Sequence, residues 1–278
     1  MNTIEQKKEA YKNLVERIIQ EKKKFTGENK FKGKKLSFEW CSFCRQINLW
    51  TYWQGLGCYN PKILLVGQDF GYSNDLRVKV GIETENKKDH YAVFDKKDAV
   101  VHYFDGADDC EIDPTDRNLC ELFSFLGYDD IQHQKYEDLF FTNISLMYRS
   151  DPKISGGFVK KDCDEFDLDV FKELVDILEP TVIICLGKIT SELVMKALGL
   201  KSPIKKFKDL FINNPHQELI YQKGNKKIAV FPEYHCGSLG VMNRNRIEGK
   251  NYNTDKTGLS LIEEDWSVIK KYLEAHSK

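Results

Sequence analysis

The sequence predicts an α/β fold with a three-layer α/β/α arrangement around a central, mostly parallel sheet of four strands. Two features lead to this prediction. Short, continuous apolar runs are bounded by turn residues, which is typical of strands buried on both faces. Segments with the apolar spacing of helices alternate with these runs, and such alternation favours a parallel sheet covered by helices. The predicted strands are residues 62–66, 139–143, 181–186 and 227–231.

The N-terminal half contains two predicted helices. Residues 3–24 place apolar side chains from Tyr11 to Ile19 at helical spacing, which indicates an amphipathic helix. Together with a Lys/Gly-rich loop, this helix is expected to form an N-terminal extension over about residues 1–37. Residues 71–113 are polar and irregular, and a loop of this length is usually functional or partly disordered. A second helix is predicted over 114–126, because Pro114 is typical of a helix start and Gly127 of a helix end.

The C-terminal half contains three longer predicted helices. They cover residues 164–178, 190–198 and 261–275, and the first two are followed by Glu179-Pro180 and by Gly199. Residues 201–226 are basic and are expected to form a loop with a short helix at 206–213. The Gly/Asn-rich segment that follows the last strand, up to residue 258, is also expected to be a loop.

Composition is typical of a soluble globular chain. The 278 residues are 41% hydrophobic and 31% charged, and they are predicted to form one domain over residues 1–278. We expect a cytoplasmic monomer without membrane association, because no apolar run approaches the ~20 residues that span a bilayer and the polar N-terminus lacks a secretory signal. Eight cysteines in a chain of this length suit free thiols in a reducing compartment. The net charge of −1 gives no global indication of nucleic-acid binding, although residues 201–208 form a local basic cluster.

Polar residues follow each predicted strand. Asp69 follows the first strand, Asn143 ends the second, Lys188 follows the third and His235 follows the fourth. Parallel strands would bring these side chains to one edge of the sheet, where α/β proteins usually bind their ligands. The alternative for Asn143 is a hydrogen bond to the backbone at a strand end, and for His235 a purely structural histidine.

These strand ends resemble the ordered motifs of the uracil-DNA glycosylase superfamily. The resemblance rests on Gly67-Gln68-Asp69, Thr142-Asn143, Leu186-Gly187-Lys188 and His235-Cys236-Gly237-Ser238-Leu239, and it extends from about residue 41 to the C-terminal helix. The resemblance implies a DNA glycosylase of base excision repair, which hydrolyses the N-glycosidic bond of uracil or another deaminated base. Its partner would be DNA that contains such a base, and its chemistry needs no cofactor.

The resemblance also implies a role for each matching residue. Asp69 would orient the attacking water, and Gln68 and Asn143 would line the base pocket. His235 would stabilise negative charge on the departing base. Leu239 would enter the duplex as an apolar wedge, beside Ser238 as a further DNA contact, although an apolar residue near a loop is more often part of a core.

The physical chemistry of the reaction fits these residue types. Cleavage of an N-glycosidic bond produces a cationic sugar and an anionic base, which a carboxylate and an imidazole respectively stabilise. An asparagine offers the donor and acceptor that match uracil O4 and N3–H. A base within a duplex must be flipped out, and an apolar wedge offsets the lost stacking. For the phosphates, Arg244 and Arg246 are candidate contacts in addition to the basic cluster.

The chain departs from the uracil-specific branch in its base pocket. Gly71 stands where that branch has the tyrosine that blocks the methyl group of thymine, which suggests a wider substrate range. A stacking aromatic residue is expected after the first motif, and Phe94 is our candidate.

A second departure concerns cysteines. Cys41-x-x-Cys44 resembles half of the ligand set in the iron–sulfur branches, and Cys163 lies near the place of a later ligand. One ligand of four has no obvious counterpart. Cys58 or Cys110 would have to supply it if an iron–sulfur cluster or zinc is bound at Cys41, Cys44 and Cys163.

Two other functions are compatible with the sequence. The first is a glycosylase-like protein that binds nucleic acid or a nucleotide with little or no catalysis, which the altered motifs and the net charge favour. The second is an unrelated α/β hydrolase. His235 and Cys236 argue against a Cys–His nucleophile in such an enzyme, because neighbouring residues of an extended strand point to opposite faces.

Overall fold

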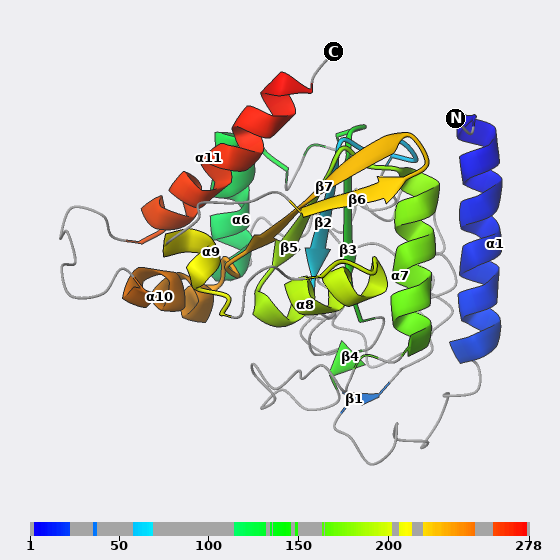
Figure 1. The fold of residues 1–278 in the computed structure, drawn as a ribbon, viewed down its shortest axis with the longest axis horizontal. Coiled ribbons are helices and arrows are strands. Elements are labelled where there is room, and N and C mark those ends of the chain that lie inside the picture. The colour runs from blue at the N-terminus through cyan, green and yellow to red at the C-terminus, as the bar shows by residue number, and fades with distance from the viewer. Residues whose placement is uncertain are drawn as a thin grey trace, which may run out of the picture.

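A five-stranded sheet forms the centre of the fold in the computed structural model (Figure 1). The order is β3-β2-β5-β7-β6; the first four strands are parallel and β6 is antiparallel to β7. The strands are β2 (Ile63–Gly67), β3 (Leu139–Asn143), β5 (Val182–Leu186), β6 (Leu219–Lys223) and β7 (Lys226–Glu233), with β1 (Leu36–Ser37) and β4 (Tyr148–Arg149) as a separate antiparallel pair. The structure describes residues 3–22, 36–37, 58–68, 114–131, 134, 136–145, 148–149, 163, 165–201, 206–212, 219–247 and 258–276.

The four predicted parallel strands are confirmed, but the prediction of a four-stranded sheet is wrong. The fifth strand, β6, lies in the segment that was expected to be a loop. It pairs with β7 through a hairpin whose turn begins at Gly224, where a φ of 56° is readily adopted by glycine. Only Leu219 and Tyr221 of this strand are buried, because β6 is at the edge of the sheet, so its sequence lacks a continuous apolar run.

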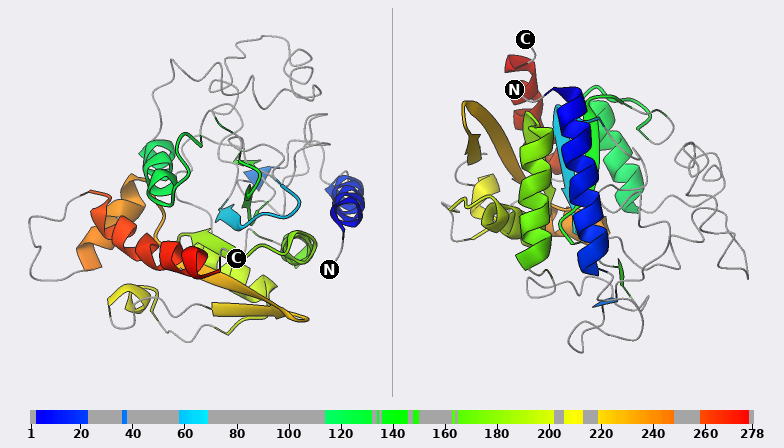
Figure 2. Two further views of the ribbon diagram at one scale, coloured as in Figure 1. Left: turned by 90° about the horizontal axis from the view of Figure 1, so that it is seen from above. Right: turned by 90° about the vertical axis from the view of Figure 1, so that its right-hand side faces the viewer.

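Helices cover both faces of the sheet (Figure 2). Along β2, Leu64 and Val66 belong to one hydrophobic core, whereas Ile63 and Leu65 belong to the other, as the alternation of a strand requires. The first core includes α1 (Ile4–Lys22), α7 (Glu165–Leu178) and α8 (Lys188–Ala197). The second core includes α6 (Pro114–Phe125) and α11 (Ser260–Ala275).

The N-terminal helix is an integral part of the first core. Tyr11, Leu14 and Ile18 are buried together with side chains of α7 and of the sheet. Lys7 is also buried, and its ammonium group donates a hydrogen bond of 2.9 Å to the carbonyl of Leu178 in the last turn of α7. A cation at the C-terminal end of a helix is favourable, so this contact fixes α1 against α7.

Two shorter helices, α9 (Asp209–Ile212) and α10 (Ser238–Ile247), complete the seven helices of the described residues. The expectation of a loop after the last strand is wrong for α10. This helix buries Gly240 and Arg244 and exposes Leu239 and Met242, so its sequence shows no apolar periodicity. None of the helices within the described ranges is long and apolar enough to cross a membrane.

Candidate functional site

The four parallel strands end at the same edge of the sheet, and the described residues that were predicted to gather at the strand ends lie there. Gln68 follows β2, Asn143 ends β3, Lys188 begins α8 directly after β5, and His235 follows β7. Because the strand order is β3-β2-β5-β7, these residues follow one another along the edge in the order Asn143, Gln68, Lys188 and His235. The sequence prediction that these strand ends meet is therefore confirmed.

Asn143 and Gly67 are in direct contact. They are register partners of β3 and β2, and a Cβ placed on Gly67 would lie 2.2 Å from Asn143 Oδ1. The amide of Asn143, whose residue is only 8% exposed, thus occupies the space that a side chain at position 67 would need. Asn143 therefore leans from β3 over the end of β2, and this arrangement requires glycine at position 67.

The backbone pairing of β2 and β3 continues beyond the strands. The N–H of Ile144 donates to the carbonyl of Gly67 at 2.9 Å, and the N–H of Ser145 donates to the carbonyl of Gln68 at 3.0 Å. These bonds hold Gln68 beside the segment that follows Asn143. The structure thus brings together the first two motifs of the resemblance, as far as Gln68.

His235 is half-buried, and its ring accepts a hydrogen bond. The N–H of Gly237 donates to His235 Nδ1 at 2.9 Å. Since Nδ1 accepts, the neutral ring carries its proton on Nε2, which is then a hydrogen-bond donor. A neutral imidazole with a donor at Nε2 is able to stabilise negative charge that develops on a ligand oxygen.

Two glycines allow the chain to approach His235 closely. Gly187, between β5 and α8, has a φ of 92°, and a Cβ there would lie 3.6 Å from His235 Cβ. A Cβ on Gly240 would lie 1.8 Å from the His235 carbonyl oxygen, so no other residue fits that position of α10. His235 is thereby held between the end of β5 and the first turn of α10.

The loop that carries His235 is also attached to α6. The Asn118 amide donates to the carbonyl of Cys236 at 2.7 Å, and the Cys236 thiol donates to the carbonyl of Thr115 at 3.6 Å. A Cβ on Gly237 would lie 2.6 Å from Thr115 Oγ1. Sequence reasoning missed Asn118, which no motif marks, because its role depends on how α6 packs against the loop.

Ser238 and Leu239 begin α10 and are exposed. The Leu239 side chain is 62% exposed, the highest value among the large hydrophobic residues that are described as exposed. The alternative that Leu239 belongs to the core is therefore wrong. An exposed leucine four residues after His235 is available to contact a binding partner.

The structure is at odds with the predicted phosphate contact of Arg244. This residue is 3% exposed, and its Nε and Nη2 donate to Asp265 Oδ2 and Oδ1 at 2.6 and 2.8 Å. Its guanidinium also lies 5.7 Å from the ring centroid of Phe211. A guanidinium held by a buried bidentate ion pair is not presented to phosphates at the surface. Arg246, two residues later, is exposed.

Glu233, the last residue of β7, is a buried carboxylic acid that sequence reasoning also missed. Burial raises its pKa well above the ordinary value of 4.5, the Asp265 carboxylate raises it further, and Arg244 lowers it. The carbonyl of Glu233 accepts the N–H of Gly187 at 2.7 Å. Three ionisable side chains are therefore buried near the His235 loop: the Arg244–Asp265 ion pair and Glu233, whose raised pKa favours the protonated acid. The predicted site residue Lys188, by contrast, is on the surface of α8. Its side chain is 60% exposed, and its Nζ lies 4.0 Å from Glu192 Oε1.

The other predicted site residues lie outside the described residues. These are Asp69, which follows Gln68 directly, Gly71 and Phe94 of the base pocket, and Cys41 and Cys44 of the expected metal site. Cys163 is described: it is buried, and its thiol donates to the carbonyl of Ile144 at 3.7 Å, just beyond Asn143. Within the described ranges, no three His, Cys, Asp or Glu side chains are grouped to hold a metal ion.

Comparison with protein-family models and with curated proteins found no match to this chain.

Proposed function

We propose that this protein is a DNA glycosylase that hydrolyses the N-glycosidic bond of uracil or another deaminated base. One observation carries the proposal. At the edge, β2 ends in Gly67 and β5 is followed by Gly187; the side chains of Asn143, from the neighbouring strand β3, and of His235, from the loop after β7, lie against these glycines. Neighbouring strands are about 4.8 Å apart, so an amide and an imidazole are gathered around the ends of two adjacent strands.

These two groups suit the recognition and departure of a pyrimidine. Asn143 offers a carbonyl oxygen and an NH₂ group, the pair that matches N3–H and O4 of uracil. The Nε2–H of His235 would donate to the base oxygen on which negative charge grows as the glycosidic bond breaks. A neutral imidazole gives this stabilisation without a proton transfer, because a hydrogen bond to an anion is stronger than one to a neutral carbonyl.

The remaining roles rest on the order of the motifs. Asp69 would supply the carboxylate that stabilises the cationic sugar and orients water. Leu239, exposed at the start of α10, would fill the space that the flipped nucleotide leaves in the duplex. Asp69 would thus act on the sugar and Leu239 on the duplex, whereas Asn143 and His235 would act on the base itself.

The test is base excision from oligonucleotides that carry uracil, hypoxanthine, xanthine or a mismatched thymine, followed by alkaline cleavage at abasic sites. We expect excision of at least one of these bases. Asp69→Asn and His235→Asn should each lower the single-turnover rate by about 10² or more, the scale of one preorganised catalytic group. His276→Asn is a matched control, because His276 is an exposed histidine near the C-terminus.

The same experiment separates the proposal from a protein that only binds. Tight, uncleaved binding of all four oligonucleotides would favour the non-catalytic alternative. Excision at the wild-type rate by Asp69→Asn would remove the carboxylate from the mechanism.

A further inference from the structure

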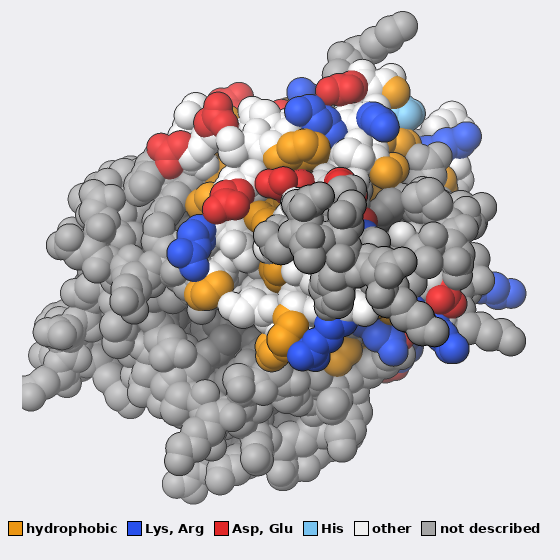
Figure 3. Space-filling model, turned by 90° about the vertical axis from the view of Figure 1, so that its left-hand side faces the viewer, with side chains coloured by type: hydrophobic (Ala, Val, Ile, Leu, Met, Phe, Trp, Pro, Cys, Tyr) orange, Lys and Arg blue, Asp and Glu red, His pale blue; other side chains and the backbone are white. Residues whose placement is uncertain are grey.

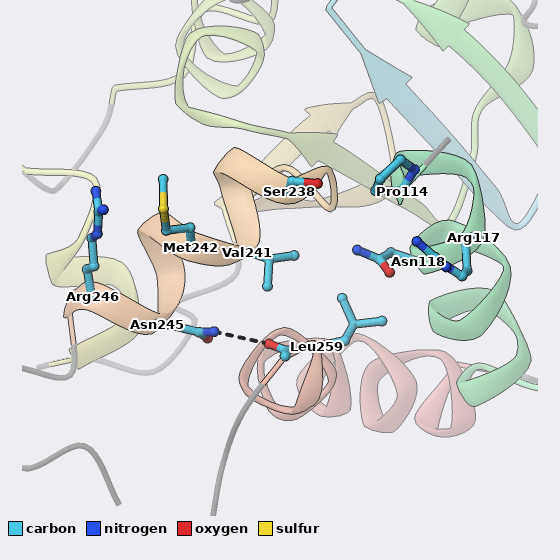
Figure 4. Close-up of a pocket in the computed structure, with 10 residues that line it drawn as sticks. Pro114, Arg117, Asn118, Ser238, Val241, Met242, Asn245, Arg246 and Leu259 are labelled. Carbon is cyan, nitrogen blue, oxygen red and sulfur yellow. Dashed lines mark hydrogen bonds between the residues drawn. The ribbon is translucent and has the colours of Figure 1, made fainter. Parts of the chain in front are cut away.

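A cavity of about 500 Å³ opens beside the His235 loop, between α6, α10 and the start of α11 (Figure 4). Its walls come from elements that are far apart in the sequence, with Arg117 on α6, Arg246 on α10 and Leu259 at the start of α11. Ser238, the first residue of α10, also lines it. The cavity is therefore adjacent to the candidate site but separate from Asn143 and Gly67.

The charged residues that line this cavity are both basic. Figure 4 places Arg117 and Arg246 at opposite ends of it, and both side chains are exposed. None of the described residues that line the cavity is acidic, and neither arginine is paired with an acid in the described part of the chain. Two guanidinium groups without acidic partners favour an anionic ligand with more than one charge.

Between the two arginines the cavity is apolar. The side chains of Val241 and Leu259 point toward each other across its middle (Figure 4). On the side of the molecule that carries these helices, basic and hydrophobic side chains lie next to each other at the described surface (Figure 3). An elongated ligand with charges at intervals and apolar carbon between them fits this lining better than a compact anion does.

One wall of the cavity is connected to the candidate site by a hydrogen bond. Asn118 lines the cavity and donates to the carbonyl of Cys236, next to His235. Asn245 lines the opposite side and donates to the carbonyl of Gly258 at 3.3 Å. A chain molecule that binds with one unit at His235 would therefore reach the cavity with the units that follow.

We infer that this cavity holds the phosphodiester backbone of the nucleic-acid strand next to the nucleotide bound at His235. Arg117 and Arg246 would each contact a phosphate, and a sugar would pack against Val241 and Leu259. This inference rests on the proposed function for the choice of a nucleic-acid strand. The sequence had suggested Arg244 and Arg246 for such contacts; the cavity keeps Arg246 and adds Arg117 of α6 in place of the buried Arg244.

The experiment measures binding of a fluorescein-labelled single-stranded oligodeoxycytidylate, which carries no deaminated base, across a range of KCl concentrations. We expect Arg117→Gln and Arg246→Gln each to weaken binding by about 5- to 10-fold at low salt. Each should reduce the slope of log affinity against log salt by about 0.7, the value for one phosphate of a single strand. The double variant should show both losses. Lys12→Gln is the matched control, because Lys12 is exposed on α1, which packs against the other face of the sheet.

Three results would overturn the inference. The first is a double variant with the wild-type slope and affinity. The second is an equal loss in Lys12→Gln, which would indicate a general charge effect. The third is that inorganic phosphate competes for binding as well as a thymidine dinucleotide does at the same concentration, which would indicate a simple anion site.

Failure of the proposed function gives a different pattern. Arginine-dependent binding without excision of any base would reject the glycosylase and keep the strand-binding cavity. If the double variant excises bases with the same KM for DNA as the wild type, the cavity does not bind the strand, but the protein is still a glycosylase. The thermal midpoint of each variant should match that of the wild type, because both arginines are exposed.

Discussion

Asn143 and His235 stand at opposite ends of the candidate site, and different kinds of contact hold them. Asn143 is fixed by the parallel ladder of β2 and β3 and by close packing on Gly67. His235 lies beyond the end of β7, in a loop held by side chains of α6 and backed by the buried pair of Arg244 and Asp265. One end of the site is positioned by regular backbone pairing, and the other by polar side chains from helices distant in the sequence.

This difference has an energetic consequence. In a ladder between buried strands each residue contributes one backbone hydrogen bond among many, so a change at one residue leaves most of the ladder in place. A buried ion pair is a single contact, and removal of one partner leaves a charge in the interior without compensation. The His235 end should therefore be more sensitive to single polar substitutions, whereas the Asn143 end should be sensitive to changes of volume.

The largest expected effect is at Arg244. Arg244→Met should lower the free energy of unfolding by about 3–5 kcal/mol, because Asp265 would remain buried without its partner. The double variant Arg244→Met/Asp265→Leu should recover most of this loss, because no charge of the pair then remains in the interior. Urea denaturation at pH 7 measures both. If the single and double variants are equally unstable, packing rather than charge explains the role of Arg244.

The contrast also explains what the sequence predicted. The four parallel strands and the edge at which they meet were predictable, because buried strands are continuous apolar runs that end at polar residues. The buried pair of Arg244 and Asp265 was not predictable, because nothing in the sequence of α10 distinguishes the buried Arg244 from the exposed Arg246. Strand β6 was missed for a similar reason, because an edge strand buries only alternate side chains.

The second prediction concerns volume at the Asn143 end. In Gly67→Ala the new methyl group would lie 2.2 Å from Asn143 Oδ1, so the amide must move. We expect a loss of about 1–3 kcal/mol in the free energy of unfolding, as for an overpacked core, together with a loss of base excision. The double variant Gly67→Ala/Asn143→Ala should regain stability but not excision. Wild-type excision by Gly67→Ala would show that the amide of Asn143 does not read the base.

The third prediction tests the interior charge near His235 through pH. The pKa of Glu233 is raised in the folded state, mainly by burial, so folding favours the protonated acid. The contribution of Glu233 to stability should therefore be greatest below the ordinary pKa of 4.5, where folded and unfolded chains both hold the proton, and should be lost as pH rises toward the higher folded pKa. Glu233→Gln removes this titration, so its stability relative to wild type should increase between about pH 5 and pH 7.

Urea denaturation of Glu233→Gln and wild type at several pH values measures this difference. Glu121→Gln is a suitable control, because Glu121 is an exposed glutamate on α6. A constant difference between Glu233→Gln and wild type across this range would mean that Glu233 binds protons equally in the folded and the unfolded chain there, which contradicts a raised folded pKa.

The smallest effect on stability is expected at Leu239. This residue takes part neither in the β2–β3 pairing that holds Asn143 nor in the contacts that hold the His235 loop. Its side chain is 62% exposed, so Leu239→Ala should change the free energy of unfolding by less than about 0.5 kcal/mol. If Leu239 fills the gap left by a flipped nucleotide, excision from duplex DNA should fall by about tenfold or more, because unstacking costs a few kcal/mol. Excision from a single strand should be unchanged, since no duplex stacking is lost there.

The control is Ile4→Ala, because Ile4 is a similarly exposed apolar residue on α1; this variant should leave both rates unchanged. Equal losses on duplex and single strand would instead indicate that Leu239 acts through the His235 loop, so this ratio shows whether α10 contacts DNA directly or only holds the histidine.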